Sequence, residues 1–417
     1  MGYLLGWFVS VLDAGQRVGV ATGNLGQPGM GTVGGALQTL FRDGDRESEL
    51  SDICVRIFGF PLTLDRVNGN VLLRIGTPGI PSPPLQHPTQ EYADAVLALP
   101  ALADQGDGVK NYLGMVLHLM TGQASIVVLD EPEAFLHPAQ GRALGRHLGQ
   151  QAAEHNRQLF TATHDRDFVL GLLESDCPTT LLRINRVGTM SSSAALDATE
   201  VKDIWDKPAL RYSNVLQGLF HRAVAVCEAD ADCRWYGAVL DQMGRRIGVP
   251  SEEVLLVPAG GKAQVPICMN ALAALDVRAF AILDFDAILD TDFIITLLDS
   301  LKDAGEDLKE EVKRLTRTIK NQLTTPEQKR HAKMAGLQGL PAGDVTRMAK
   351  DVVSRLRSCG ALVVAVGEME SFDRSLGGHG SAWVTAALTA DRHLASPDAE
   401  ALLEPILSAL APATSRV

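Results

Sequence analysis

The sequence predicts an α/β protein built from two domains with parallel sheets. Short apolar runs, typical of buried parallel strands, recur along the chain, and several end in carboxylates, as in residues 125–130. Segments with helical periodicity alternate with these runs. A length of 417 residues and a hydrophobic content of 46% are enough for two hydrophobic cores.

Composition and targeting signals predict a cytoplasmic protein that does not enter membranes. No apolar run approaches the roughly 20 residues that a membrane helix needs, and the start, from Met1, lacks the basic region of a secretory signal. The six cysteines are dispersed without CxxC pairs, so neither a zinc site nor a disulfide framework is indicated.

The chain begins with an expected strand over residues 3–12 and a glycine-rich segment over residues 23–35. A P-loop needs the pattern Gly-x-x-x-x-Gly-Lys-Ser/Thr, because its amides cradle phosphates and its lysine reaches the terminal ones. Residues 23–35 lack the Lys-Ser/Thr pair, and Lys262, after two glycines, is followed by Ala263. We therefore interpret residues 23–35 as a flexible loop and find no P-loop in the sequence.

The next feature is a glycine-bearing start to an apolar helix, expected over residues 112–120. Backbone amides at such a helix start can meet phosphate oxygens. Gly106, Asp107 and Gly108 are therefore candidate nucleotide-binding residues.

The strand that follows ends in Asp130 and Glu131, the pattern of a Walker B motif. One carboxylate can hold Mg²⁺ through water, and the next can orient the water that attacks a γ-phosphate. A helix over residues 139–154 and a strand over residues 158–163 would bring His164 beside Glu131 at one sheet edge. His164 is then a candidate γ-phosphate sensor; the alternative is a histidine in a surface loop.

The second half contains strands that end in acidic residues. Glu228 ends a run over residues 221–228, and Asp232 follows one helical turn later. Asp284 and Asp286, two apart at the end of the run 279–286, are expected to project to one side of an extended chain and share a metal. Taken alone, this Asp-x-Asp is more often a polar turn, but together with Glu228 at the end of an earlier strand it favours a metal site.

A third acidic strand end follows, because residues 361–370 form an apolar run that finishes with Glu368 and Glu370. Between the second and third ends, residues 309–357 hold twelve basic and five acidic residues, although the whole chain carries a net charge of -12. This basic, helical island is either a solvated face or a DNA-contacting face.

Taken together, the first-half segments resemble the ABC-type ATPase domain of RecF-like, SMC-like and OLD-family (overcoming lysogenization defect) proteins. In that resemblance residues 105–114 act as the signature motif facing ATP on a second subunit, and residues 133–138 match the OLD counterpart of the D-loop. The second half resembles the Toprim domain of topoisomerases, primases and OLD-family nucleases. The resemblance implies ligands for Mg²⁺ or Mn²⁺ at Glu228, Asp232, Asp284, Asp286, Glu368 and Glu370.

The resemblance also assigns roles outside the metal ligands and shows two departures. Lys262, in a glycine-lysine turn, would contact the scissile phosphate or DNA, and His379 is either a phosphate contact or an exposed loop residue. Ala229 stands where the Toprim glycine usually follows the glutamate, and no lysine precedes His379. Glycine there permits close backbone approach to the metal.

The predicted organisation is an ATPase domain over residues 1–190 and a linker over 191–212, followed by a Toprim domain over 213–390 with a helical insertion at about 291–358. A tail over 391–417 would end disordered. Because the P-loop is missing, we expect either a chain that starts downstream of the family's usual beginning or a degenerate ATPase.

The predicted function is an ATP-gated, Mg²⁺- or Mn²⁺-dependent DNA endonuclease of OLD type, acting in phage defence or DNA repair as a homodimer or higher oligomer. The ATP site would be incomplete in this chain. The alternative is a noncatalytic DNA-binding scaffold or regulatory subunit, or a fragment, with an unidentified partner protein.

Overall fold

The structure is a computed structural model that describes residues 8–22, 35–68, 71–84, 87–187, 189–211 and 214–410. Its mixed α/β architecture with parallel sheets confirms the α/β class that the sequence predicts. The expected strand positions before residue 8 and the glycine-rich loop over residues 23–34 lie outside the described residues. No described helix is long and apolar enough to cross a membrane.

The chain divides into two compact units, Met1–Thr179 and Thr180–Val417. The expected linker over 191–212 contains regular structure, which corrects that prediction. It carries most of strand β7 (Met190–Leu196) and the helix α9 (Ala198–Trp205). Asp197 caps this helix by accepting from the amides of Thr199 and Glu200, and Trp205 is buried, so the polar segment folds onto the second unit.

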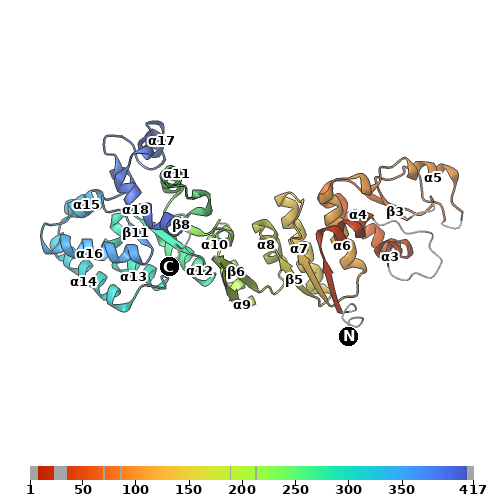
Figure 1. Ribbon diagram of the computed structural model, residues 1–417, viewed down its shortest axis with the longest axis horizontal. Helices are drawn as coiled ribbons and strands as arrows, with labels where there is room; N and C mark the ends of the chain where they lie inside the picture. The colour runs from red at the N-terminus through yellow and green to blue at the C-terminus, as the bar shows by residue number, and fades with distance from the viewer. Residues whose placement is uncertain are drawn as a thin grey trace. The chain divides into compact units, whose positions relative to one another are not determined.

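The first unit is built around a three-stranded parallel sheet in the order β1-β4-β5. Its elements are β1 (Val9–Leu12), α2 (Ala14–Thr22), α3 (Ala36–Arg42), α4 (Gly44–Phe58), β2 (Leu62–Asp65), β3 (Leu72–Ile75), α5 (Gln90–Leu97), α6 (Asp107–Thr121), β4 (Ile126–Asp130), α7 (Pro138–Glu154), β5 (Gln158–Ala162) and α8 (Arg166–Leu173) (Figure 1). Parallel pairing of Asp130 with Ala162 brings the carboxyl ends of β4 and β5 side by side.

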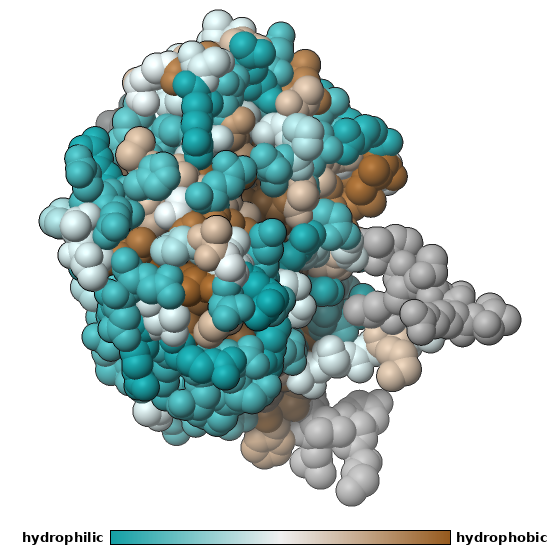
Figure 2. All heavy atoms as spheres, turned by 90° about the vertical axis from the view of Figure 1, so that its left-hand side faces the viewer, coloured by the Kyte–Doolittle hydropathy of each residue, from teal (hydrophilic) through white to brown (hydrophobic). Residues whose placement is uncertain are grey.

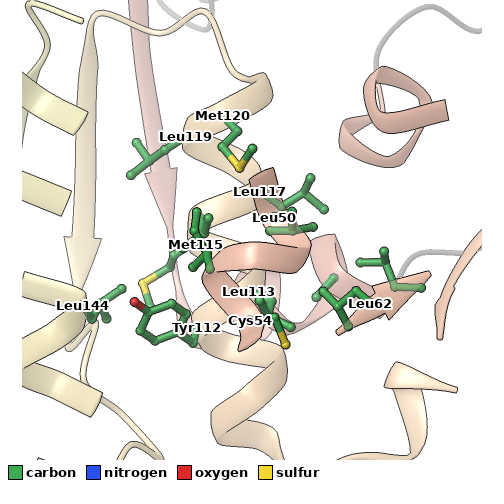
Figure 3. Close-up of a cluster of buried hydrophobic side chains, with 14 of the residues drawn as sticks. Leu50, Cys54, Leu62, Tyr112, Leu113, Met115, Leu117, Leu119, Met120 and Leu144 are labelled. Carbon is green, nitrogen blue, oxygen red and sulfur yellow. The ribbon is translucent and has the colours of Figure 1, made fainter. Parts of the chain in front are cut away.

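Helix α6 forms the centre of this unit's core. Tyr112 and Leu113 are almost completely buried, and they pack with Leu50 and Cys54 of α4 and with Leu144 of α7 (Figure 3). Each such side chain contributes about 1.5–3 kcal/mol through burial. The core therefore holds α6 firmly against the sheet that carries Asp130.

The second unit contains a four-stranded parallel sheet in the order β11-β10-β8-β9. Its elements are the hairpin β6 (Leu181–Val187) and β7, α9, α10 (Pro208–Arg211), β8 (Ala223–Cys227), α11 (Asp230–Ile247), β9 (Val254–Pro258), α12 (Val265–Ala274), β10 (Ala279–Leu283), α13 (Thr291–Asp299), α14 (Glu306–Gln322), α15 (Pro326–Ala335), α16 (Asp344–Ser358), β11 (Ala361–Val363), α17 (Ser381–Thr389) and α18 (Pro397–Ser408). All five residues of β8 are buried, as expected for a central parallel strand.

Helices occupy the expected insertion between β10 and β11, from α13 to α16. The expected tail differs from the prediction, because α18 packs Leu403 and Ile406 into the core of this unit. Amphipathic spacing of these apolar residues outweighs the internal Pro405. Residues 411–417 lie outside the described part of the chain.

Candidate nucleotide site and candidate metal centre

The Walker B strand of the first unit delivers two exposed carboxylates at its end. Asp130 is the last residue of β4, and the next residue, Glu131, has a left-handed backbone with a φ of 44°. Its amide donates to the carbonyl of Ala162 over 2.9 Å, which continues the ladder with β5 by one residue. The left-handed backbone at Glu131 therefore turns the chain away from the direction of β4, while the Glu131 amide stays hydrogen-bonded to β5.

His164 lies at the same sheet edge, after β5. Its Nδ1 is 3.3 Å from Oε1 of Glu131, and 74% of the imidazole side chain is exposed. The structure thus brings together the two residues that the sequence pairs as water-orienting base and phosphate sensor.

Glu133 is a third carboxylate of this group that the sequence analysis did not single out as a site residue. Its Oε1 accepts from the Thr163 hydroxyl over 2.7 Å and from the His164 amide over 3.3 Å. The residue is 8% exposed, and its other oxygen, Oε2, is buried without a hydrogen-bond partner among the described residues. Glu133 ties the end of β5 to the Walker B turn.

Arg17, which the sequence analysis missed, also holds this turn in place. The guanidinium is fully buried and donates to Asn111 Oδ1 over 2.7 Å, to the Asp130 carbonyl over 2.6 Å and to the Glu131 carbonyl over 3.0 Å. Burial lowers the pKa of Arg17, while the acidic residues around it, first of all Asp13, act in the opposite direction. A buried cation thereby fixes the backbone that presents Asp130 and Glu131.

Asn111 completes this clamp from helix α6. Its side-chain amide donates to the carbonyls of Pro132 and Ala134, over 3.0 and 2.8 Å. The oxygen of the Asn111 amide accepts from the guanidinium of Arg17, and its NH₂ group donates to the two carbonyls. Helix α6 therefore positions the Walker B turn as well as packing the core.

The three candidate residues at the start of α6 have different surroundings. Gly106 is the N-cap, and the space that a side chain would occupy there is open. Asp107 pairs with Lys110 over 2.8 Å. A side chain at Gly108 would lie 2.4 Å from the carbonyl oxygen of Phe135, so this glycine serves the close approach of α6 to the Walker B turn.

These residues supply carboxylates, a histidine and a helix start, but not a complete nucleotide site. The sequence has no Gly-x-x-x-x-Gly-Lys-Ser/Thr segment to cradle phosphates. ATP therefore fits this chain's residues only in part.

The second unit gathers the acidic candidates at the carboxyl ends of its parallel strands. Glu228 follows β8, Asp284 follows β10, and Glu368 follows β11 by a short loop. Because β10 lies between β11 and β8, Asp284 occupies the middle of this edge. Ligands of open α/β sheets bind at such an edge.

The local geometry of Asp284 and Asp286 corrects the predicted extended chain. Strand β10 ends at Leu283, and Asp284 begins a 3₁₀ helix over Phe285–Leu289. The Phe285 amide donates to the Gly367 carbonyl over 2.7 Å, a long-range bond that turns the chain. Asp284 and Asp286 therefore do not share one side of a strand.

The third acidic end also differs from the predicted strand over residues 361–370, because the strand stops early and the acids lie in a turn. Strand β11 covers only Ala361–Val363, and Glu368 begins another 3₁₀ helix, Met369–Phe372. Glu370 lies inside that turn and accepts from the Gly380 amide over 2.6 Å. His379 Nδ1 lies 2.6 Å from Glu370 Oε1, and the three side chains Glu368, Glu370 and His379 offer atoms within 4.8 Å of one another.

Burial and, after it, the neighbouring carboxylates shift the pKa of Asp284. Burial, followed by the charges of Glu228, Asp232, Asp286 and Glu368, raises the pKa of Asp284 to about 8. Burial is also the main cause of the raised pKa of Glu228 and of Asp232. These groups compete for protons because no protein cation balances them fully.

Asp286 differs because two lysines neutralise it. Lys262 Nζ lies 3.2 Å from its Oδ1, and Lys333 Nζ lies 3.0 Å from its Oδ2. Burial would raise the pKa of Asp286, but the hydrogen bonds from Lys333 and Lys262 hold it below its usual value. Lys333, on helix α15 of the insertion, is a site residue that the sequence analysis had placed only in the basic island.

The departure at Ala229 has no conformational cost. Its φ of -137° and ψ of 169° are extended angles that any residue adopts, and its amide donates to Asp232 Oδ2 over 2.8 Å. The turn after Glu228 therefore forms without a glycine.

The acidic edge fits a divalent cation by two observations. Glu228 Oε1 is buried without a hydrogen-bond partner among the described residues, and Asp284 is surrounded by like charges. Hard carboxylate oxygens of this kind suit Mg²⁺ or Mn²⁺. Among the described residues, Glu368, Glu370 and His379 are the group whose ligand atoms already lie close enough together to share a cation. Glu228, Asp232, Asp284 and Asp286 are further acids of this edge, and a cation would have to draw their carboxylates closer together to be held by them.

The insertion is attached to this edge by two glycines. A side chain at Gly336, just after α15, would lie 2.1 Å from the Ala365 carbonyl oxygen, and one at Gly367 would lie 2.3 Å from that of Met334. The Leu337 amide also donates to the Ala365 carbonyl over 2.9 Å. The end of α15 is thereby fixed against the loop that leads to Glu368.

Comparison with known proteins places a family match on the first unit. Residues 83–171 match the family described as "AAA domain, putative AbiEii toxin, Type IV TA system". The match includes the start of α6, the Walker B turn and His164. It supports an ATPase-type, nucleotide-binding domain in this part of the chain.

Similarity to solved structures and to curated proteins is weak or absent. A solved chain from work on the structural biochemistry of ATP-driven dimerization and DNA stimulated activation of SMC ATPases aligns at 12% identity, covering 41% of this chain and 95% of that chain. Its TM-score of 0.28 is too low to carry an argument. No curated protein matches the chain.

Proposed function

We propose that this protein is a divalent-metal-dependent DNA endonuclease in which an ATPase-type domain controls a Toprim-like nuclease domain, as in OLD-family proteins. The observation that carries the proposal is the convergence of acidic residues from β8, β10 and β11 on one sheet edge around Asp284. Structural ion clusters rarely leave a carboxyl such as Glu228 buried and without a partner.

The chemistry follows from the residues at this edge. A divalent cation, when bound, would polarise a phosphodiester and lower the pKa of a water molecule. Glu228, Asp232 and Asp284 supply the negative charge that binds it, and Glu368 and Glu370 supply a second group of oxygens. Lys262 is held over the Phe293 ring at 4.8 Å, which fixes a positive charge beside the acids.

A DNA substrate is supported by the charge of the insertion. Figure 2 shows the face of the second unit that carries α14 to α16, on which hydrophilic residues predominate. Some residues of the basic island already form ion pairs within the protein, such as Lys309 with Asp299 and Arg355 with Asp307. The exposed basic side chains without a described ion pair are available for phosphates; among them are Arg314, Lys329, Arg330 and Lys350.

Control by ATP is the second part of the proposal. Asp130, Glu131 and His164 form an exposed group, and the open space at Gly106 marks an accessible helix start. Such half-sites are completed when two ATPase domains meet head to tail, so we propose a homodimer. The phosphate cradle has to come from outside the motifs found in this sequence.

The test is cleavage of supercoiled plasmid by the purified chain with Mg²⁺ or Mn²⁺, with and without ATP. Asp284→Asn removes a central acid with little change in shape, and Asp351→Asn is the matched control on the exposed side of α16. We expect nicking by the protein and by Asp351→Asn, and a loss of at least about 100-fold in Asp284→Asn. Equal nicking by both variants would show that another site or a contaminant cuts the DNA.

The alternative function is a noncatalytic DNA-binding scaffold, and the observation that favours it is the lack of a P-loop in the sequence. A scaffold would bind duplex DNA without cutting it in Mg²⁺ or Mn²⁺, and ATP would change neither binding nor oligomeric state. Filter-binding with labelled ATP and sedimentation with and without ATP separate this function from the nuclease.

A further inference from the structure

Lys333 reaches the acidic edge from a helix of the insertion. It belongs to helix α15 of the insertion, far along the chain from Asp286, yet its Nζ contacts Asp286 Oδ2 over 3.0 Å. The attachment of Gly336 and Leu337 to the loop at Ala365 fixes the helix end, so only the side chain of Lys333 is left to move.

The two lysines on Asp286 are not equivalent. Lys262 has further contacts, with the Asp286 carbonyl over 3.3 Å, with Asp290 over 3.8 Å and with the Phe293 ring. Its side chain is 24% exposed, whereas that of Lys333 is 44% exposed. Among the described contacts, Lys333 has a direct ion pair with Asp286 alone. Lys262 is therefore held in place by several contacts, whereas Lys333 is the lysine that can leave Asp286.

We infer that Lys333 is a metal-linked positioning residue of the proposed nuclease centre: it occupies Asp286 in the metal-free protein and moves to a DNA phosphate once a divalent cation takes that carboxylate. The inference rests on the proposed function and adds a residue and a sequence of events to it. Two cations cannot share one carboxylate oxygen at contact distance without strong repulsion. A four-carbon side chain on a fixed helix end has the reach to leave Asp286 without moving the backbone.

This exchange would couple metal loading to DNA engagement. Without metal, the charge of Lys333 is neutralised by Asp286, so the centre offers little attraction to phosphate. With metal, the same ammonium group becomes free beside the acids and provides the cation that the sequence lacks before His379.

The first measurement is Mn²⁺ binding to the metal-free full chain, by electron paramagnetic resonance of free Mn²⁺ or by calorimetry. Lys333→Met keeps the apolar stem and removes the charge. Lys302→Met is the matched control, because Lys302 is an exposed lysine that pairs with a different carboxylate, Asp276, and lies outside the basic island. We expect Lys333→Met to bind Mn²⁺ about 3- to 10-fold more tightly, because a competing cation is gone. Lys302→Met should bind Mn²⁺ like the unmodified protein.

The second measurement is binding of a short DNA duplex in Ca²⁺, which reports phosphate contact without requiring cleavage. We expect Lys333→Met to bind DNA several-fold more weakly than Lys302→Met, with a salt dependence lower by about one phosphate contact. Unchanged or weaker Mn²⁺ binding in Lys333→Met, or DNA binding equal to that of Lys302→Met, would overturn the inference. If the unmodified protein fails to cut plasmid while both expected shifts appear, the nuclease proposal fails and the exchange of Lys333 stands.

Discussion

The Nε of Arg17 donates a hydrogen bond of 2.7 Å to Oδ1 of Asn111, and both residues are fully buried. One residue lies on α2 and the other on α6, and each also bonds to carbonyls of the turn that presents Asp130 and Glu131. The pair therefore joins two helices to the Walker B turn through a single polar network.

This network predicts a large stability loss when one member is removed. Asn111→Ala leaves the buried guanidinium without one partner and two carbonyls without a donor, so we expect a loss of about 3 kcal/mol in the free energy of unfolding. Arg17→Met should cost a similar amount. Urea unfolding followed by circular dichroism of the full chain measures both.

The double variant separates a network from two independent contacts. Because both substitutions break the same bonds, the combined loss should be smaller than the sum by about 1–3 kcal/mol. Strict additivity would contradict the coupling.

The contact between Gly108 and the Phe135 carbonyl predicts a second stability difference. Gly108→Ala would place a carbon 2.4 Å from that oxygen, and α6 must shift, at a cost of about 1–3 kcal/mol. Gly106→Ala meets open space with an ordinary φ of -61° and should stay within about 1 kcal/mol of the unmodified chain. Thermal unfolding of the two variants is the check, and an equal melting temperature would be inconsistent with the close approach.

The raised pKa of Asp284 predicts how stability changes with pH in the metal-free protein. Its folded pKa of about 8 lies above the unfolded value of 3.8, so the folded state holds the proton more tightly. This stabilisation is fully present below pH 3.8 and is lost as the pH rises toward 8. Thermal unfolding in EDTA should therefore show a lower melting temperature at pH 8.5 than at pH 6.

Asp284→Asn removes this titration. The variant should lose less stability than the unmodified chain between pH 6 and 8.5 and should be the more stable of the two at pH 8.5. An unmodified protein whose stability changes over this range no more than that of Asp284→Asn would rule out the proposed cause.

Mn²⁺ binding to the unmodified chain should release protons, and the affinity for Mn²⁺ should rise from pH 6 to pH 8.

Glu133 predicts a difference between two small changes. Glu133→Gln keeps an oxygen for the Thr163 hydroxyl and the His164 amide, so its stability should lie within about 1 kcal/mol of the unmodified chain. Glu133→Ala removes the acceptor and should cost about 1–3 kcal/mol. Hydrogen exchange at His164 should speed up in the alanine variant alone; equal exchange in both would mean that Glu133 does not hold this strand end.

The sequence was sufficient for features that depend on local patterns. The alternation of apolar strands with helices predicted β4, α7, β5 and β8 within a few residues, because parallel strands and amphipathic helices have distinct periodicities. Carboxylates at strand ends likewise placed Asp130 and Asp284 at sheet edges, since all strands of a parallel sheet end on the same side.

Features that depend on distant contacts were not accessible from local patterns. Leu283 ends β10 because the Phe285 amide bonds to Gly367, a residue that follows the whole insertion. Arg17 was not singled out from the sequence, because its burial depends on the bond to Asn111, 94 residues further along the chain. Lys333 was one basic residue among twelve until the fold placed it on Asp286.

The mutual approach of Gly336 and Gly367 limits how this protein can be engineered. Four helices between two strands look like a removable module, and deleting them would seem a direct route to a minimal domain. The shortened chain would lose the ammonium group of Lys333, which contacts Asp286. It would also lose the backbone at the end of α15, against which the loop before Glu368 packs. Shortened versions meant to isolate the acidic edge should therefore keep α13 to α16, and grafts of other insertions need a matching pair of glycines at the same joint.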